Sequence, residues 1–195
     1  MTVPPFAVTH SQIVWSCRWY SVRQDVLRLA DGSTAEYNTV QKGPAVFIVP
    51  ITAAGEVVLI RSYRHPVGEW CWEVPAGAIQ AGQTAEQAAV AELREEVGGT
   101  AESWQYFGRY FSANGFCDEA FHVYLATGVQ LGQPEHEPLE IIEIHPTPIL
   151  HALHMAQTGQ ITDGMSALAL LLTLGSGGAG EQRSRGAEET ERLRD

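Results

Sequence analysis

The hydrophobic and polar positions of the chain predict an N-terminal set of strands, a middle part with buried strands and one amphipathic helix, and two C-terminal helices. Residues 11–42 are rich in β-branched and aromatic residues and carry turn residues at 30–33, so they predict three antiparallel strands. Such a small sheet is marginal alone and needs a surface to pack against. Two apolar runs, 45–51 and 57–63, predict a buried hairpin that opens the main domain.

One amphipathic helix is predicted from about Thr84 to Val97. Gln87, three residues after Thr84, completes the pattern of a capping box, and Gly98 is a typical stop residue. The side predicted to face the core is a stripe of three apolar residues at helical spacing: Val90, Leu93 and Val97. Further strands are predicted at 103–111, 120–127 and 141–144, and helices at 148–157 and 165–174, the last capped by Asp163.

Three carboxylates of the first helix, those of Glu92, Glu95 and Glu96, fall on one arc because residues three and four apart are neighbours on a helix. At a separation of roughly 6 Å and an effective dielectric of about 20, each close pair repels by about 3 kcal/mol. A solvated acidic face tolerates this repulsion, whereas a hard cation such as Mg²⁺, which binds one or two carboxylates and substrate phosphates, removes it. The cluster therefore predicts a metal site, with a bare acidic surface as the alternative.

The segment from Gly77 to Gly99 resembles the signature box of the Nudix hydrolases: a glycine, a variable stretch, then Arg-Glu-apolar-x-Glu-Glu-x-Gly. The matching positions are Gly77, Glu92, Leu93, Glu95, Glu96 and Gly98. Gln83 and Ala91 depart from the pattern, since they stand where the family has a glutamate and an arginine that are thought to pair. Because both partners are changed together, no charge is left alone, and we interpret the change as a softened scaffold with intact metal ligands.

Three shorter segments resemble the ADP-ribose and nucleotide-sugar branch of the same family. RSYR at 61–64 resembles the RQYR of that branch, and WEVPAG at 72–77 resembles WELPAG. The loop 112–119 resembles S-P-G-x-x-x-E, with Asn114 where a proline often stands. The resemblance implies a Nudix-type α/β/α sandwich around a mixed β-sheet, preceded by an N-terminal antiparallel β unit.

The resemblance also implies roles for particular residues. Metal ligands would be Glu92, Glu96 and the backbone carbonyl of Ala76, with Glu95 assisting as a candidate catalytic residue. The candidate substrate-binding residues are Arg64, Tyr63, Glu73, Gly77 and Glu119. Arg64 is the candidate phosphate contact because its planar fork suits phosphate oxygens; an unpartnered surface arginine is the alternative. For Glu119 the alternative is an exposed acid in a plain hairpin loop.

A polar, acidic loop at 132–140 is the expected source of the general base or of a further metal ligand. Glu137 and Glu135 are the first candidates and Glu140 is the third. His136 is another candidate base, because the ordinary pKa of a histidine lies near neutral pH. A solvated acidic loop without a catalytic role is the alternative.

Charge and cysteine content limit the partners. The net charge is −11 and Lys42 is the single lysine, which argues against a nucleic-acid partner but not against a small phosphorylated substrate bound with a metal. Three dispersed cysteines, no apolar run of membrane-spanning length and an N-terminus unlike a secretory signal predict a cytoplasmic protein without a membrane partner.

The expected domains are an N-terminal β unit at 1–42, a Nudix domain at 43–174 and a flexible tail at 175–195. By resemblance, the β unit is exchanged between the subunits of a homodimer. Trp15 and Trp19 would then be interface anchors or a stacking surface for a base, with ordinary core packing as the alternative. The predicted reaction is Mg²⁺- or Mn²⁺-dependent hydrolysis of the diphosphate bond of ADP-ribose or a related nucleoside diphosphate sugar. A non-catalytic nucleotide-binding or regulatory protein on the same fold is the alternative.

Overall fold

The computed structural model describes residues 4–136 and 141–175. The chain forms two compact units. The first unit takes its residues from Met1–Ala45 and Arg109–Phe121, and the second from Val46–Gly108 and His122–Asp195. The predicted division at 42/43 stays a prediction, and nearly all of the predicted tail lies outside the described residues.

The first unit contains a three-stranded antiparallel sheet in the order β1-β2-β3, as the alternating pattern predicts. Its strands are β1 (Ala7–Ser16), β2 (Ser21–Arg28) and β3 (Thr34–Gln41). Trp19 and Tyr20 lie at or beside the β1–β2 turn, where the Cys17 N–H donates to the Tyr20 carbonyl at 2.9 Å. That turn ends β1 earlier than strand propensity alone predicts.

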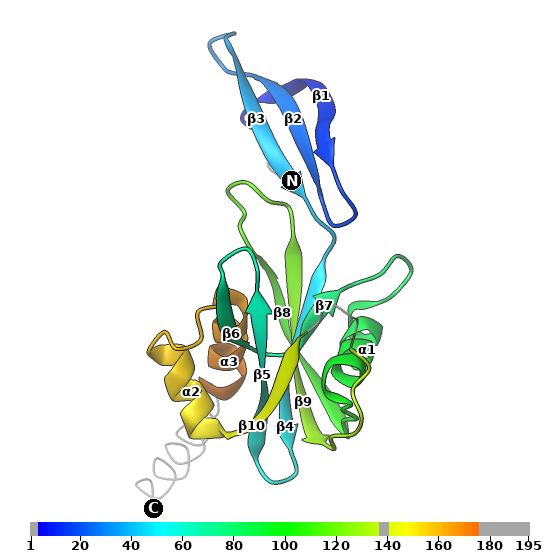
Figure 1. The fold of residues 1–195 in the computed structure, drawn as a ribbon. Helices are drawn as coiled ribbons and strands as arrows, with labels where there is room; N and C mark the ends of the chain where they lie inside the picture. The colour runs from blue at the N-terminus through cyan, green and yellow to red at the C-terminus, as the bar shows by residue number, and fades with distance from the viewer. Residues whose placement is uncertain (1–3, 137–140, 176–195) are drawn as a thin grey trace, which may run out of the picture. The chain divides into compact units, whose positions relative to one another are not determined.

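The second unit is built on a seven-stranded sheet between helices, so the predicted three-layer α/β fold is confirmed (Figure 1). Five strands follow the order β10-β5-β4-β9-β8, while β6 pairs with β5 and β7 pairs with β4. The strands are β4 (Ala45–Thr52), β5 (Glu56–Arg64), β6 (Glu69–Glu73), β7 (Ala76–Ala78), β8 (Ser103–Phe111), β9 (Ala120–Val129) and β10 (Ile142–Pro148). The short strands β6 and β7 were not predicted from the hydrophobic pattern.

Helix α1 (Ala85–Val97) begins and ends as its sequence predicts. Thr84 and Gln87 form both hydrogen bonds of a capping box, and Gly98 ends the helix in the left-handed region at φ 64°. One prediction about its faces was wrong, because Val90 is exposed while Ala88 and Ala89 are buried in the core with Leu93 and Val97. Ala88 and Ala89 form part of the surface of α1 that packs on the sheet.

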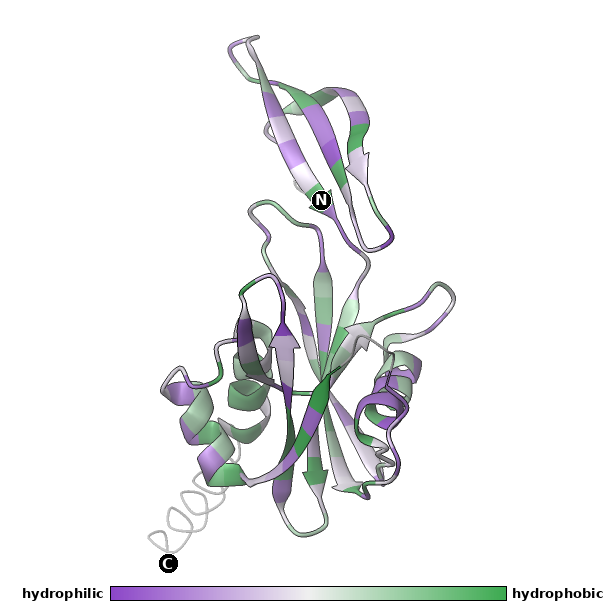
Figure 2. Ribbon diagram, viewed as in Figure 1, coloured by the Kyte–Doolittle hydropathy of each residue, from purple (hydrophilic) through white to green (hydrophobic). Residues whose placement is uncertain are grey.

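Helices α2 (Ile149–Gln157) and α3 (Gly164–Gly175) lie on the opposite face of the sheet from α1 (Figure 1). Hydrophobic residues predominate in α3 (Figure 2), and its buried residues are Ser166, Ala169, Leu170 and Thr173. Its cap is the predicted one, since the Ser166 N–H donates to Oδ2 of Asp163 at 2.9 Å. No helix in the described part of the chain is long and apolar enough to cross a membrane.

Candidate active site

Gly77 of β7 lies directly against the carboxylate of Glu92. A Cβ added to Gly77 would stand 2.0 Å from Oε1 and 2.3 Å from Oε2 of that glutamate, far inside van der Waals contact. Only a residue without a side chain allows the backbone and the carboxylate to approach so closely. This contact accounts for a glycine at the first position of the box.

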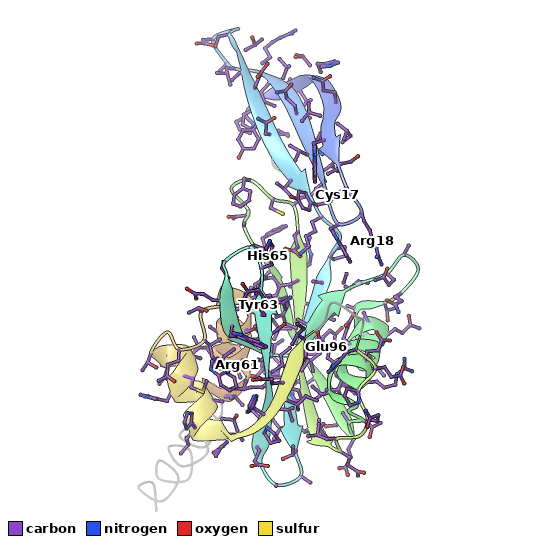
Figure 3. The ribbon with its side chains drawn as sticks, in the orientation of Figure 1. Cys17, Arg18, Arg61, Tyr63, His65 and Glu96 are labelled. Carbon is purple, nitrogen blue, oxygen red and sulfur yellow. The ribbon has the colours of Figure 1, made fainter. Side chains whose placement is uncertain are left out.

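Glu96 reaches the neighbouring residue of the same strand. Its Oε2 accepts a hydrogen bond from the Ala76 N–H at 2.9 Å, and the residue is only 7% exposed. Figure 3 shows Glu96 on the side of α1 that faces the sheet. The capped helix therefore delivers two carboxylates, one turn apart, to two consecutive residues of β7.

These two carboxylates fit a hard divalent cation. The cradle at Gly77 and Ala76 brings together oxygen donors of the kind that Mg²⁺ prefers. Within residues 4–136 and 141–175, however, no three His, Cys, Asp or Glu side chains form a group that could hold a metal. Glu95 points elsewhere, with its Oε1 3.1 Å from Nη2 of Arg94. Mg²⁺ usually binds through only one or two carboxylates and keeps waters and substrate phosphates in its shell, so a pair of carboxylates is compatible with such a site.

Arg64 and Glu73, both predicted to bind substrate, pair with each other. The Arg64 Nε donates to Oε1 of Glu73 at 2.7 Å, and its Nη2 donates to Oε2. The Arg64 side chain is 48% exposed, whereas that of Glu73 is 7% exposed. Hydrogen bonding to Glu73 raises the pKa of Arg64 against the effect of burial, with added attraction from Glu73, Glu96 and Asp163. Arg64 is thus a fixed cation beside the carboxylates, oriented by a buried acid.

The turn between β6 and β7 is held from both sides. The Val74 N–H donates to Oγ of Ser166 at 3.1 Å, and the Pro75 carbonyl accepts from the Ile48 N–H at 2.9 Å. Ser166 is fully buried. No sequence pattern indicated this contact, because Ser166 lies 92 residues from Val74 in a helix interpreted only as core.

The acidic loop is attached to the end of α1. The Glu135 N–H donates to the Glu95 carbonyl at 2.8 Å, and Nε2 of His136 lies 2.7 Å from the Glu96 carbonyl. A carbonyl only accepts, so Nε2 is the donor, and a base function of His136 would use Nδ1. The other two candidate bases, Glu137 and Glu140, lie outside the described residues.

Tyr63 projects from the opposite face of β5 to Arg64, because successive side chains of a strand alternate. Its ring meets Trp70 of β6 edge-on at a centroid distance of 5.9 Å, and it is 43% exposed. Arg61 lies on the same face of β5, with its guanidinium 5.4 Å from the Trp70 ring centroid (Figure 3). Tyr63 and Arg64 therefore do not share one surface of the strand.

Two sets of predicted residues belong to the first unit. Glu119 is buried and its Oε1 lies 2.5 Å from Nζ of Lys42, so the alternative of an exposed loop acid is wrong. Trp15 and Trp19 are 48% and 63% exposed, which excludes core packing within the chain. Their roles as interface anchors or stacking surfaces stay predictions.

The two positions that depart from the box, Gln83 and Ala91, carry no charge. Oε1 of Gln83 accepts the Gln80 N–H at 3.0 Å, and the Gln83 N–H donates to the Gln80 carbonyl at 3.0 Å. Gln83 therefore stabilises its own loop. Ala91 is partly exposed on α1. The carboxylates of Glu92 and Glu96 reach β7 without a charged pair at these positions.

Comparisons with known proteins show the family of the chain. The NUDIX domain model matches residues 41–164. An ADP-ribose pyrophosphatase of Mycobacterium tuberculosis is 33% identical over 170 residues, covering 85% of this chain and 82% of that protein. An ADP-ribose pyrophosphatase of Bacillus subtilis is 27% identical over 146 residues, covering 74% and 79%. The chain therefore belongs to the Nudix family, and the predicted family is confirmed.

Among solved structures, the crystal structure of an ADP compounds hydrolase superposes with a TM-score of 0.80. The match covers 92% of this chain and 98% of that one at 21% identity. At this identity the likeness shows the fold alone, and it extends over nearly the whole chain.

Proposed function

We propose that the protein hydrolyses the diphosphate bond of ADP-ribose or a related nucleoside diphosphate sugar, giving a nucleoside monophosphate and a sugar phosphate. The observation that carries this proposal is the convergence of the Glu92 and Glu96 carboxylates on Gly77 and Ala76, beside the paired Arg64. The substrate class rests on the two relatives that are ADP-ribose pyrophosphatases.

Glu92 and Glu96 would hold a divalent cation, Mg²⁺ first and Mn²⁺ second, together with the Ala76 carbonyl. When bound, such a cation neutralises charge on the diphosphate and polarises a phosphorus–oxygen bond. The chain's own contribution is to fix the two carboxylates before the substrate binds. Groups that are already in place need no reorganisation energy during the reaction.

Arg64 would bind a phosphate oxygen of the substrate. Its Nε and Nη2 are engaged by Glu73, and the half-exposed guanidinium carries further N–H groups. Glu73 then acts by orienting Arg64, in addition to or instead of its predicted place near the ribose. A buried carboxylate that fixes one edge of a guanidinium lowers the ordering cost of binding at the other edge.

In the hydrolysis a water oxygen bonds to one phosphorus, the bridging phosphorus–oxygen bond breaks, and a glutamate takes the water proton. Glu137 and Glu135 are the first candidates for that base, with Glu95 also a candidate. The backbone of Glu135 is fixed to Glu95 at the end of α1, which supports the loop as the source. Glu119 as a substrate-orienting residue likewise stays a proposal.

We propose that the working form is a cytoplasmic homodimer built through the N-terminal sheet. This sheet and its β1–β2 turn expose large apolar side chains, including Val8, Ile13, Trp15 and Trp19, which are each about half exposed or more. The cytoplasmic setting is supported by three cysteines that are all free.

The test is a screen of ADP-ribose and other nucleoside diphosphate sugars with Mg²⁺ or Mn²⁺, in which the released nucleoside monophosphate is identified. Metal-dependent turnover that stops on adding a chelator is the expected result. Tight binding of ADP-ribose without turnover under either metal would instead favour the non-catalytic nucleotide-binding protein. Turnover that is indifferent to chelator would contradict the role of Glu92 and Glu96.

A further inference from the structure

Each residue of the segment Glu73–Gly77 contacts another element of the second unit: β4, β5, α1 or α3. The side chain of Glu73 is held by Arg64, and the Ala76 N–H is held by Glu96. Gly77 lies against Glu92. The two residues between, Val74 and Pro75, carry no polar side chain, so only their backbone groups can form hydrogen bonds.

At Val74 the partner is a buried hydroxyl from α3. Ser166 is fully buried, and its Oγ lies 3.1 Å from the Val74 nitrogen. The same Oγ donates to Oδ2 of Asp163 at 2.6 Å, which leaves its lone pairs for the Val74 N–H. The capping acid thereby orients the hydroxyl toward the segment.

We infer that Ser166 is a positioning residue for the carboxylate cradle and acts through the Val74 N–H. Val74 precedes by two residues the Ala76 N–H that Glu96 binds. A change in the backbone at Val74 therefore shifts the Ala76 N–H and the Gly77 Cα against their carboxylates. Ser166 lies beyond the residues 41–164 that match the family model, so the family pattern does not assign it this role.

The effect of removing this hydroxyl follows from burial. Val74 is fully buried. If its N–H loses the acceptor, the desolvation free energy of this buried donor is no longer offset by a hydrogen bond. The segment relieves that cost by moving toward another acceptor or toward solvent, and either movement takes Ala76 with it. Groups that orient metal ligands in this indirect way typically change metal affinity or activity by about 10- to 100-fold when they are lost.

The chain offers a matched control in the same helix. Thr173 of α3 also has a buried hydroxyl, but it donates to the Ala169 carbonyl at 2.9 Å, within its own helix. Ser166→Ala and Thr173→Val each remove one buried hydroxyl from α3. Only the first removes a contact to the segment Glu73–Gly77.

The experiment compares these two variants with the wild type in the full chain. Mn²⁺ binding is titrated without substrate, the amide hydrogen exchange of Ala76 is measured, and kcat and KM for ADP-ribose are determined. We expect Ser166→Ala to weaken Mn²⁺ binding by about 10- to 100-fold, to speed exchange at Ala76 and to lower kcat more than it raises KM. Thr173→Val is expected to leave these three quantities near their wild-type values.

Equal effects of the two variants would overturn the inference, because they would show a general loss of stability. Wild-type Mn²⁺ affinity and Ala76 exchange in Ser166→Ala would overturn it as well. Should Ser166→Ala fail to fold, Ser166→Cys keeps a weaker acceptor at this position and is expected to show an intermediate loss; wild-type values there would contradict the inference.

The kinetic part of this inference rests on the proposed function. Mn²⁺ binding and the amide exchange of Ala76 distinguish a failure of the inference from a failure of the proposed function. A wild type that neither turns over ADP-ribose nor binds Mn²⁺ contradicts the proposed function. The exchange of the Ala76 amide tests the relay from Ser166 in either case, because the hydrogen bond from Ala76 to Glu96 joins two groups of the chain itself.

Discussion

The turn that carries the candidate active site and the N-terminal sheet are stabilised in opposite ways. The segment Glu73–Gly77 lies between buried strands and receives contacts from β4, β5, α1 and α3. In contrast, every residue of β1 is exposed. The polar bonds on the N-terminal sheet run mainly between its own neighbouring strands, as the bond from Ser11 to Asp25 shows.

This difference indicates what each region needs from outside. The carboxylate cradle is complete within the second unit, so one chain is sufficient to place Glu92 and Glu96. The N-terminal sheet has exposed aromatic and aliphatic side chains on its surface. Three-stranded sheets need a hydrophobic face that packs against something, so we expect a second copy of the chain to cover this one.

The largest expected effect comes from Glu96→Gln. The amide oxygen can still accept the Ala76 N–H, so the cradle keeps its shape, but the negative charge that would hold a cation is lost. Metal-assisted stabilisation is worth several kcal/mol, and we expect kcat to fall by about 100- to 1000-fold. Turnover of ADP-ribose with Mg²⁺ is the measurement.

Glu95→Gln is the control for this substitution, because Glu95 pairs with Arg94 instead of β7. A smaller loss is expected there at equal melting temperature. If both variants lose the same activity, the structural distinction between the two glutamates has no catalytic meaning.

The next effect comes from Gly77→Ala, which places a methyl group where the Glu92 carboxylate now lies. The end of a glutamate side chain moves readily, so stability should change by no more than about 1–3 kcal/mol. The displaced ligand should nevertheless weaken metal binding and lower activity by about 10- to 100-fold. Gly43→Ala is the comparison, since nothing lies within 4 Å of a Cβ there and its φ is not in the left-handed region. Comparable activity in both variants would show that the close approach at Gly77 is unimportant.

The features that were predicted best from the sequence are those that depend on residues close together in the chain. The capping box at Thr84, the stop at Gly98 and the cap at Asp163 all formed, because each involves neighbours within a few residues. The box spacing also placed Glu92 and Glu96 on one side of α1. The pairing of Arg64 with Glu73 was not predicted, although a hairpin of β5 and β6 places both side chains on one face of the sheet.

The remaining features depend on tertiary packing that no periodicity encodes. Val90 fits the apolar stripe as well as Ala89 does, and only the close approach of α1 to the sheet decides which is buried. Ser166 contacts Val74 because α3 packs beside the β6–β7 turn, and the two residues are 92 positions apart in the sequence. The direction of Glu95 likewise follows from its partner Arg94 and not from its position in the box.

A third prediction addresses the N-terminal sheet. The double substitution Trp15→Ala, Trp19→Ala removes two exposed aromatic rings, and aromatic anchors at the centre of an interface are commonly worth about 2 kcal/mol or more. We expect dimer dissociation to become at least roughly 30-fold easier, measured by sedimentation at several protein concentrations. Leu150→Ala in α2 is the control, because this side chain is 80% exposed and lies in the second unit. An unchanged dimer, or a wild type that is monomeric, would contradict the proposed role of the sheet.

The smallest expected effect concerns Asp25, the buried acid of the same sheet. The hydrogen bond from the Ser11 hydroxyl lowers its pKa below the ordinary 3.8, against the effect of burial and with help from Arg23. A lowered pKa in the folded state means that stability is complete above the unfolded value and is lost as pH falls through the folded one. Amide hydrogen exchange along β2 should therefore report loosening of the sheet only below about pH 4. Asp25→Asn should remove that acid step while the Ser11 contact persists; an identical acid transition in the variant would place its origin in another carboxylate.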